Sequence, residues 1–134
     1  LMPILLLASA ALIAVAALVP ARAADEVFVT AEGAIRGYDA VAYHTRSRAV
    51  PGLATITHTW NGATWRFASE EHRALFAADP ERYAPRYGGY CAYGTSRGYK
   101  VSTDPQAFAI VDGRLYLNYN PSVQATWNQD RRVY

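Results

Sequence analysis

The amino-acid sequence predicts a small domain of the α+β class, in which antiparallel hairpins have helices packed on one face. Two observations support the strands, because the turn pairs Asn61-Gly62 and Asp112-Gly113 each separate two β-prone runs. A third supports the helices, because residues that favour helix N-caps precede stretches with helical spacing of apolar side chains. One domain is expected at residues 24–134, since these 111 residues match the usual size of a single domain.

Residues 1–23 are predicted to be a secretion signal. Residues 4–19 are apolar except Ser9, and positions 21–23 read Ala-Arg-Ala, the small-x-small pattern that signal peptidase recognises. Cleavage there would release a mature chain that starts at Ala24 and works in the periplasm. The alternative is an uncleaved signal that anchors the protein, because the apolar run is near the lower limit for a membrane span, about 17–25 residues.

The composition of the mature domain narrows the classes of function. Its formal net charge is +1, because the signal removes only Arg22 from the charged residues that give the whole chain +2. The basic residues are scattered rather than gathered into a patch, so nucleic-acid binding is not expected. Ten Tyr, four Phe and three Trp give this short chain enough large side chains to bury a core. A single cysteine, Cys91, excludes an internal disulfide.

The two-residue loop between its strands predicts the register of the first hairpin. Side chains alternate along a strand, so one side of this hairpin carries mostly Thr and the other carries aromatic and apolar residues. The second side is the expected core side, and His58 belongs to it. The predicted pairs on the core side are Trp60 with Ala63, His58 with Trp65, and Ile56 with Phe67.

A helix is predicted to follow the first hairpin. Ser69 is a suitable N-cap, and the acidic residues that follow it lie where the helix dipole favours negative charge. The helix is expected to end at about Ala78. His72, Leu75 and Phe76 have the i, i+3, i+4 spacing of one helix face, so we expect all three to face the core.

A second hairpin and a final helix complete the expected fold. The hairpin joins residues 106–111 to residues 114–119, and Asn120-Pro121 is a cap-and-proline pair that starts a helix through Trp127. The two hairpins together are expected to make most of one antiparallel sheet. Four side chains of the second hairpin are expected on one face: Phe108, Ile110, Leu115 and Leu117.

Four segments of the chain follow a recognisable pattern: GYDAVAY at 37–43, WNGATWRFAS at 60–69, FAADPERYAPRYGGYCA at 76–92 and VDGRLYLNYN at 111–120. In these segments the chain resembles the exported YHS domain-containing proteins, and the resemblance extends from about Ile35 to Trp127. It implies a metal-associated role, because the wider YHS family is found beside heavy-metal handling proteins, including copper-transporting ATPases. Many exported members have no assigned activity.

The chain departs from the metal-linked members of that family at one informative place. Those domains carry a Phe-Cys-Ser-x-x-Cys segment at the end of the hairpin, and residues 67–72 here read Phe-Ala-Ser-Glu-Glu-His. Ala68 thus stands at the first cysteine, and it cannot bind a metal. His72 stands at the second, and its imidazole can.

Cys91, His58 and His72 are the predicted ligands of a soft or borderline metal ion, copper in preference to zinc. Thiolate and imidazole are the ligands that such ions prefer, and the mature chain offers only one more of them, His44 beside a polar loop. His58 and His72 both fall on expected core-facing surfaces. The alternative for these residues is structural, as hydrogen-bonded core histidines and an inert buried thiol.

The alternative function is an aromatic-lined binding module for a small molecule or a protein partner, with no metal. It is suggested by the tyrosines around Cys91, because a Tyr side chain combines apolar area with a polar tip. Such a module would bind through a loop rich in aromatic and glycine residues. The tyrosines concerned are Tyr87, Tyr90, Tyr93 and Tyr99.

Enzymatic activity is not expected. Cys91 with His58 or His72 could form a thiolate–imidazole pair for nucleophilic catalysis. The residues that flank Cys91, however, match no recognised nucleophile motif. Asp39 is the one acidic candidate to orient the histidine, and we expect it to be a turn residue that bonds its own backbone.

Overall fold

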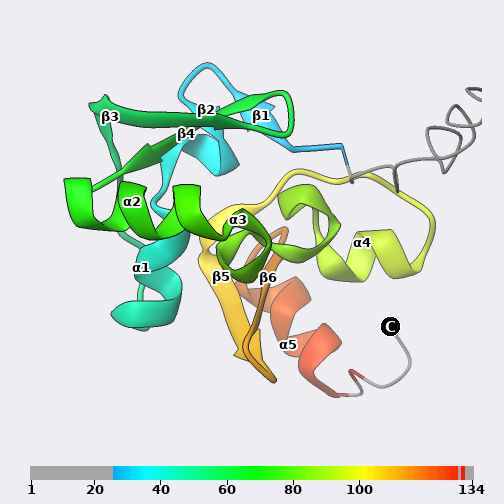
Figure 1. Cartoon of the computed structure of the whole chain (residues 1–134). Coiled ribbons are helices and arrows are strands. Elements are labelled where there is room, and N and C mark those ends of the chain that lie inside the picture. The colour runs from blue at the N-terminus through cyan, green and yellow to red at the C-terminus, as the bar shows by residue number, and fades with distance from the viewer. Residues whose placement is uncertain (1–25, 130, 132–134) are drawn as a thin grey trace, which may run out of the picture.

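The structure is a computed structural model that describes residues 26–129 and residue 131 of the 134-residue chain (Figure 1). The predicted secretion signal at residues 1–23, with its cleavage point before Ala24, lies outside the described residues. Within residues 26–129, no helix is both long and apolar enough to cross a membrane.

Helices and antiparallel strand pairs make up the described chain, which confirms the predicted α+β class (Figure 1). Three of the helices have four to six residues, so much of the chain consists of short elements joined by turns. In chain order the elements are β1 (Val29–Thr30), β2 (Gly33–Ala34), a 3-10 turn (Ile35–Gly37), α1 (Ala40–Thr45), β3 (Leu53–Trp60), β4 (Ala63–Phe67), α2 (Glu70–Ala78), α3 (Pro80–Tyr83), a 3-10 turn (Arg86–Gly89), α4 (Ala92–Ser96), β5 (Asp104–Val111), β6 (Arg114–Asn118) and α5 (Pro121–Gln129).

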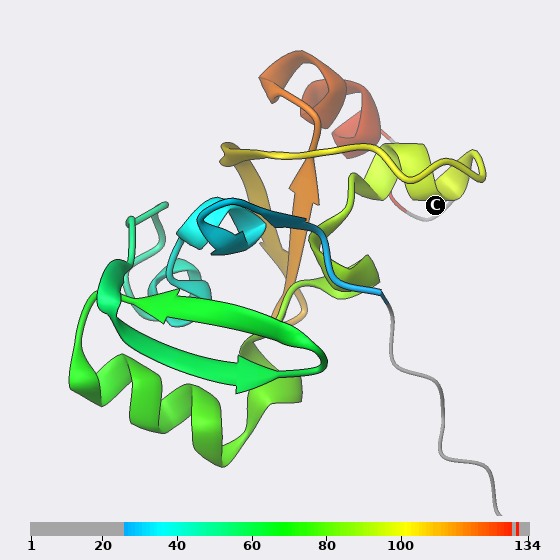
Figure 2. The same ribbon diagram turned by 90° about the horizontal axis from the view of Figure 1, so that it is seen from above.

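The two predicted hairpins do not join into one sheet, which corrects the sequence-based expectation. The described strands form three separate two-stranded antiparallel sheets: β1 with β2, β3 with β4, and β5 with β6. Figures 1 and 2 show the β3–β4 and β5–β6 hairpins running in different directions. Side chains of α1 pack against β5, with the rings of Tyr43 and Phe108 4.9 Å apart. Helix packing, rather than a strand ladder, therefore connects the second hairpin to the rest of the fold.

The first hairpin has the predicted register next to its turn. Trp60 pairs with Ala63, and His58 pairs with Trp65. The two turn residues at positions 61 and 62 have φ values of 51° and 73°, as a two-residue Asn-Gly turn requires. Local turn chemistry thus determines this half of the ladder.

Farther from the turn the predicted register is wrong. Phe67 pairs with Leu53 rather than with Ile56, because the ladder has an irregularity between Leu53 and Thr57. Extra residues in β3 are accommodated there as a bulge, which bends the strand and increases its twist. Phe67 is nevertheless buried, as expected, because the bulge lies on the partner strand.

The Asn61-Gly62 turn leads to a stability prediction. We expect Gly62→Val to lower the free energy of unfolding by roughly 1–3 kcal/mol, because a β-branched residue is strained at positive φ. No neighbouring atom lies within 4 Å of an added Cβ at Gly62, so a clash would not contribute. Gly62→Asn is the matched control, since Asn tolerates this backbone region. Urea unfolding of both variants measures the effect, and an equal loss in the two would contradict it.

Helix α2 begins and ends where the sequence predicts. The side chain of Ser69 accepts a hydrogen bond from the backbone N–H of His72 at 3.1 Å, which satisfies one of the free donors of the first turn. His72 and Phe76 are buried. Leu75 is 36% exposed, so the expected core face of this helix is narrower than its i, i+3, i+4 pattern indicates.

Phe76 lies at the centre of an aromatic cluster between α2 and the first hairpin. Its side chain is fully buried, and four rings of β3 and β4 surround it. Such tilted and edge-on arrangements add to the stabilisation that burial provides. The ring centroids lie 5.0 Å away for Trp65, 5.0 Å for Phe67, 5.8 Å for Trp60 and 6.2 Å for His58.

The second hairpin and the last helix follow the prediction closely. Asn120 caps α5, since its side-chain oxygen accepts a hydrogen bond from the backbone N–H of Val123 at 2.8 Å. Trp127 anchors this helix and is buried. Phe108 lies opposite Leu117 and Ile110 opposite Leu115, so these four side chains share one face of the hairpin, as predicted.

The aromatic and glycine-rich segment at residues 87–94 contains more structure than a loop. A 3-10 turn ends at Gly89, and α4 begins at Ala92 with Cys91 as its N-cap. Gly88 has a φ of 66°, and a Cβ there would lie 1.8 Å from the backbone oxygen of Glu26. Glycine at this position allows the segment before β1 to pass directly over the turn.

Candidate functional site

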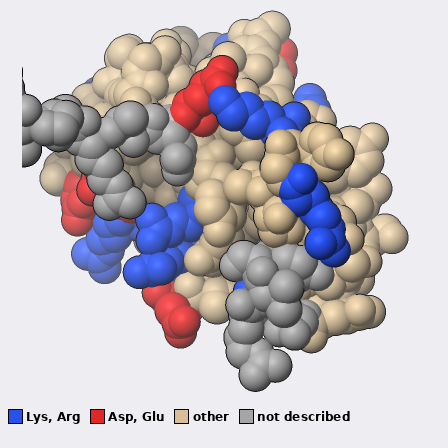
Figure 3. Space-filling view, turned by 90° about the vertical axis from the view of Figure 1, so that its right-hand side faces the viewer, with Lys and Arg blue, Asp and Glu red and all other residues tan. Residues whose placement is uncertain are grey.

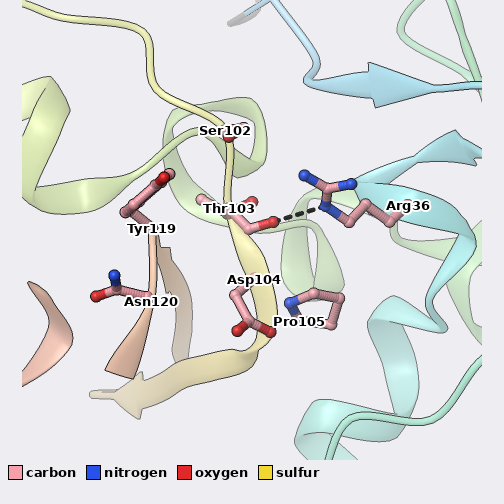
Figure 4. A pocket seen from close by; sticks show the side chains of 7 residues that line it. All are labelled: Arg36, Ser102, Thr103, Asp104, Pro105, Tyr119 and Asn120. Atoms are coloured by element: carbon pink, nitrogen blue, oxygen red, sulfur yellow. Dashed lines mark hydrogen bonds between the residues drawn. The ribbon is translucent and has the colours of Figure 1, made fainter. Parts of the chain in front are cut away.

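A pocket of about 350 Å³ opens where three distant parts of the chain meet (Figure 4). Its floor is the segment that leads into β5, residues 102–105. Figure 4 shows this floor between Arg36 on one side and Tyr119 with Asn120 on the other. The lining residues are Arg36, Ser102, Thr103, Asp104, Pro105, Tyr119 and Asn120.

Arg36 is held at the pocket by a strained turn. Its φ is 59° and that of Ile35 is 44°, a left-handed region that is sparsely populated by such residues. Residues held in such regions cost roughly 1–3 kcal/mol each and persist only where the surroundings enforce them. The buried Ile35 side chain and the hydrogen bond from Arg36 Nε–H to the Thr103 carbonyl, 2.9 Å long, enforce this conformation.

The pocket floor is rigidly held from below. The Thr103 hydroxyl donates to the Gly89 carbonyl at 2.8 Å, and the Tyr43 hydroxyl donates to the Pro105 carbonyl at 2.9 Å. Burial raises the pKa of Tyr43 far above its usual value of 10.0, and the nearby Tyr38, Asp104 and Asp39 raise it further. Tyr43 therefore remains a hydrogen-bond donor at any physiological pH.

Opposite charges line this pocket without pairing. Among the residues that the structure describes, neither Arg36 nor Asp104 has an ion-pair partner. Asp104 Oδ1 accepts a hydrogen bond from the backbone N–H of Gln106 at 2.9 Å. The Arg36 guanidinium also lies 5.5 Å above the ring of Phe28, which orients it. The arrangement can recognise a polar molecule that carries groups complementary to both charges.

The opposite wall adds neutral polar groups. Tyr119 is half exposed and its ring lies at the pocket edge in Figure 4. Asn120 uses its side-chain oxygen to cap α5, so the amide N–H groups are the part of this side chain left for a ligand. Ser102 contributes a hydroxyl from the floor. These groups can donate and accept hydrogen bonds without adding net charge.

A second cluster of titratable groups is centred on Asp39, which is fully buried. Its Oδ1 accepts hydrogen bonds from the backbone N–H groups of Val41 and Ala42, at 2.9 and 3.1 Å. Its Oδ2 accepts from the backbone N–H of Ala68 at 2.9 Å and lies 2.6 Å from His72 Nδ1. Asp39 caps its own turn, as expected, but it also binds the end of the first hairpin and α2.

The His72 imidazole continues this cluster toward the surface. Its Nε2 lies 3.4 Å from the hydroxyl of Thr45, an exposed residue. Carboxylate, imidazole and hydroxyl occur in the order that hydrolases use. The Thr45 hydroxyl, however, donates to the Val41 carbonyl at 3.2 Å, and 3.4 Å is long for a hydrogen bond to the imidazole. This geometry favours a clamp that joins α1 to α2 over an activated nucleophile.

The three predicted metal ligands lie in different surroundings. His72 is paired with Asp39, and His58 is half-buried with its ring against Phe76. Cys91 caps α4, and Figures 1 and 2 agree that α4 and α2 lie in different parts of the molecule. Within the described chain, no group of three or more His, Cys, Asp or Glu side chains is placed to hold a metal ion. Joint ligation by Cys91, His58 and His72 stays a prediction.

Cys91 is buried in a polar environment. Its side chain is 1% exposed, and Sγ lies 3.5 Å from Asn118 Oδ1 and 3.4 Å from the backbone nitrogen of Gly94. Asn118 Oδ1 also accepts from the backbone N–H of Tyr93 at 3.0 Å. A metal ion at Cys91 would have to displace these contacts.

The tyrosines near Cys91 contact different parts of the described chain. Tyr87 packs against Tyr116, and Tyr90 packs against Phe28. Tyr93 lies under the guanidinium of Arg97, and Tyr99 is 67% exposed. Binding through the tyrosines around Cys91 stays a prediction, and the pocket described above is lined by another tyrosine, Tyr119.

Charged side chains of both signs are interspersed on the molecular surface. On the face in Figure 3, blue Lys and Arg atoms lie beside red Asp and Glu atoms or are separated by uncharged residues. Among the described residues, Lys100 and Glu26 form an ion pair. The described part of this face thus carries its basic residues in scattered positions, as they are in the sequence.

His44 lies half-buried at the end of α1. Its Nε2 lies 3.1 Å from the Tyr83 carbonyl, and its ring stands edge-on to the Tyr83 ring at 5.5 Å. Burial lowers the pKa of His44 below the usual 6.5, and the nearby charge of Arg82 lowers it further. The hydrogen bond to Tyr83 acts in the opposite direction. The fold thus favours the neutral imidazole.

A pH dependence follows for His44. As the pH falls through about 6.5, the unfolded chain binds the proton first, so the free energy of unfolding should decrease until the lower folded-state pKa is reached. In His44→Phe, which keeps a ring against Tyr83 but cannot titrate, the decrease should be smaller. Urea unfolding of both proteins from about pH 7 to about pH 5 measures this. Identical pH profiles would contradict it.

The sequence does not indicate that Arg36 and Asp104 belong to a binding site. Arg36 reaches Thr103 from 67 positions earlier in the chain, and no local pattern records such a contact. Asn120 was recognised only as a helix cap. The one available signal was the Tyr119-Asn120 pair in the last segment of the YHS resemblance.

Comparisons with known proteins return no relative. No protein-family model matches the chain, and searches of curated proteins and of solved structures find no match. No relative therefore assigns a role to Arg36, Asp104 or His72.

Proposed function

We propose that the mature domain is an exported binding module that takes a small polar molecule into the pocket between Arg36 and Tyr119. The pocket itself carries this proposal: about 350 Å³ of space is enough for a small molecule, and charged and neutral polar residues line it. A binding role requires no nucleophile or general base at the pocket.

The strained turn at Ile35-Arg36 supports this proposal. Two successive non-glycine residues at positive φ are unfavourable, and such outliers cluster at binding and catalytic sites. Here they direct the Arg36 side chain across to the Thr103 carbonyl at the pocket floor. This strain lowers the stability of the fold, so stability alone does not account for it.

The resemblance to exported YHS proteins is compatible with the same role. The pocket draws on residues from Arg36 to Asn120, all within the span over which the chain resembles that family. Export to the periplasm, which the predicted signal at residues 1–23 indicates, would bring the domain into contact with imported or secreted small solutes.

A thermal-shift screen against small polar metabolites tests the proposal. Ser102→Tyr should fill the pocket, because Ser102 is half-buried and lines it. Ser96→Tyr is the matched control, since Ser96 is exposed at the end of α4. A true ligand should raise the melting temperature of the unmodified domain and of Ser96→Tyr, but not of Ser102→Tyr. Ligands that stabilise all three proteins equally, or no ligand at all, would contradict the proposed function.

A metal-handling role is the second candidate, favoured by the contact between His72 and Asp39. A histidine whose Nδ1–H is held by a carboxylate presents Nε2 to a metal ion, a common arrangement in metalloproteins. Copper, with zinc as the alternative, remains the metal to test, with Cys91 and His58 as the other expected ligands.

Titration of the metal-free domain with Cu(I) under reducing conditions decides this second candidate. Cys91→Ser should weaken binding most, because thiolate is the softest ligand available. His44→Gln is the control, because His44 is the histidine outside the predicted ligand set. Equal affinity in Cys91→Ser and in His44→Gln would remove Cys91 from any metal site.

A further inference from the structure

The unpaired charges of the pocket point to the class of its ligand. We infer that this ligand is a zwitterion, an amino acid or a close analogue, whose carboxylate binds Arg36 and whose ammonium group binds Asp104. The inference rests on the proposed function, because it names the ligand of the same pocket. It goes further by giving each of the two charges a partner.

Arg36 and Asp104 line one pocket and yet form no ion pair with each other in the described chain. Opposite charges on flexible side chains this near the same space would ordinarily be free to approach one another. Arg36 Nε–H donates to the Thr103 carbonyl, and Asp104 Oδ1 accepts from the backbone N–H of Gln106, so one atom of each charged group is fixed by the backbone. Both charged groups are therefore oriented by the backbone while their remaining atoms stay available to a ligand.

The atoms left over have the right chemistry for a zwitterion. Among the described residues, no protein acceptor binds the terminal guanidinium nitrogens of Arg36, and these nitrogens suit a carboxylate. Asp104 Oδ2 likewise accepts no hydrogen bond from a described residue, and it suits an ammonium donor. The carboxylate of the ligand would thus bind the terminal nitrogens of Arg36, and its ammonium group would bind Asp104 Oδ2.

Ligands with one charge fit this pocket less well. A simple anion would bind Arg36 but leave the Asp104 carboxylate near a like charge, and a simple cation would meet the converse problem at Arg36. A zwitterion satisfies both and changes no net charge. Tyr119, Asn120 and Ser102 then offer neutral hydrogen-bonding groups for the side chain of the ligand.

The experiment begins with the twenty common L-amino acids in the thermal-shift assay described above. For those that bind, calorimetry compares each amino acid with its N-acetyl derivative, which lacks the positive charge, and with its C-terminal amide, which lacks the negative charge. Each derivative should bind about 10- to 100-fold more weakly, the effect expected for one lost charged hydrogen bond.

Two variants test which residue binds the ammonium group of the ligand and which binds its carboxylate. Asp104→Asn keeps an acceptor for Gln106 and should weaken binding of the free amino acid about tenfold or more, without weakening the N-acetyl derivative. Arg36→Gln should weaken binding of the free amino acid to a similar extent, without weakening binding of the C-terminal amide. Arg36→Lys should recover part of the affinity for the free amino acid. Asp112→Asn, in the exposed turn of the second hairpin, is the matched control and should change nothing.

The outcomes separate this inference from the proposed function. If another polar molecule binds in a way that Ser102→Tyr blocks while no amino acid does, the zwitterion is wrong and the pocket is still a binding site. If amino acids bind but their N-acetyl derivatives bind as tightly, the inference is also wrong. If Ser102→Tyr has no effect on any ligand, both fail.

Discussion

Asp39→Asn is expected to lower the free energy of unfolding by roughly 3–5 kcal/mol, because it removes the acceptor of a fully buried hydrogen-bond network, and each buried donor left unsatisfied costs about 1–3 kcal/mol. Asp39 Oδ2 faces two donors, the backbone N–H of Ala68 and the ring N–H of His72. An amide group in its place would set a donor against both. Rotating the amide instead would lose the bonds to Val41 and Ala42.

Asp79→Asn is the matched control for this prediction. Asp79 is also the N-cap of a helix, but it is exposed and its side chain makes no capping hydrogen bond. We expect a change within about 0.5 kcal/mol, as for most surface substitutions. Urea unfolding followed by circular dichroism measures both variants. A similar small loss for Asp39→Asn would mean that the buried network contributes little to stability.

Phe76→Ala is expected to lower the free energy of unfolding by about 3–5 kcal/mol, the usual range for a buried Phe. The side chain is fully buried, and its ring contacts bring together α2, β3 and β4. Removing it would leave a cavity between aromatic rings that cannot easily collapse into it. The loss of transfer free energy and the cavity would therefore act together.

Leu75→Ala, one residue earlier on the same helix, is the control. Leu75 is 36% exposed, so it has less buried area to lose, and Ala is the better helix former. We expect a loss of under about 1 kcal/mol, since surface substitutions rarely exceed that. Thermal unfolding of the pair gives the comparison. Equal losses would show that the helix face predicted from the sequence, rather than the face in the structure, is the one that packs.

The two proposals for function make different demands on the fold. A small molecule in the pocket would use groups that are already exposed and held in place, notably Arg36 and Asp104. A metal ion bound jointly by Cys91 and His72 would require Cys91 Sγ to leave its present contacts with Asn118 and Gly94. It would also require α4 and α2, which lie in different parts of the molecule, to bring the two side chains together. We therefore propose the small molecule as the first ligand to seek.

The hairpin turn at Asn61-Gly62 and the helix caps at Ser69 and Asn120 were determined by the sequence alone. The two-residue turn at positions 61–62, the cap at Ser69 and the cap at Asn120 all occur where they were predicted. Each depends on a few neighbouring residues: backbone conformations available to Asn and Gly, or a side-chain oxygen that reaches an N–H three positions on. Such interactions involve only residues that are neighbours in the sequence, so they do not depend on how distant segments pack.

Only the tertiary structure decided which residues meet across the chain. The bulge that moves Phe67 opposite Leu53 reflects how β3 fits the rest of the molecule, not the turn beside it. The contact between Asp39 and His72 spans 33 positions, and that between Arg36 and Thr103 spans 67. These contacts depend on how the helices and hairpins pack together, because that packing sets the distance between segments whose local sequences carry no information about each other.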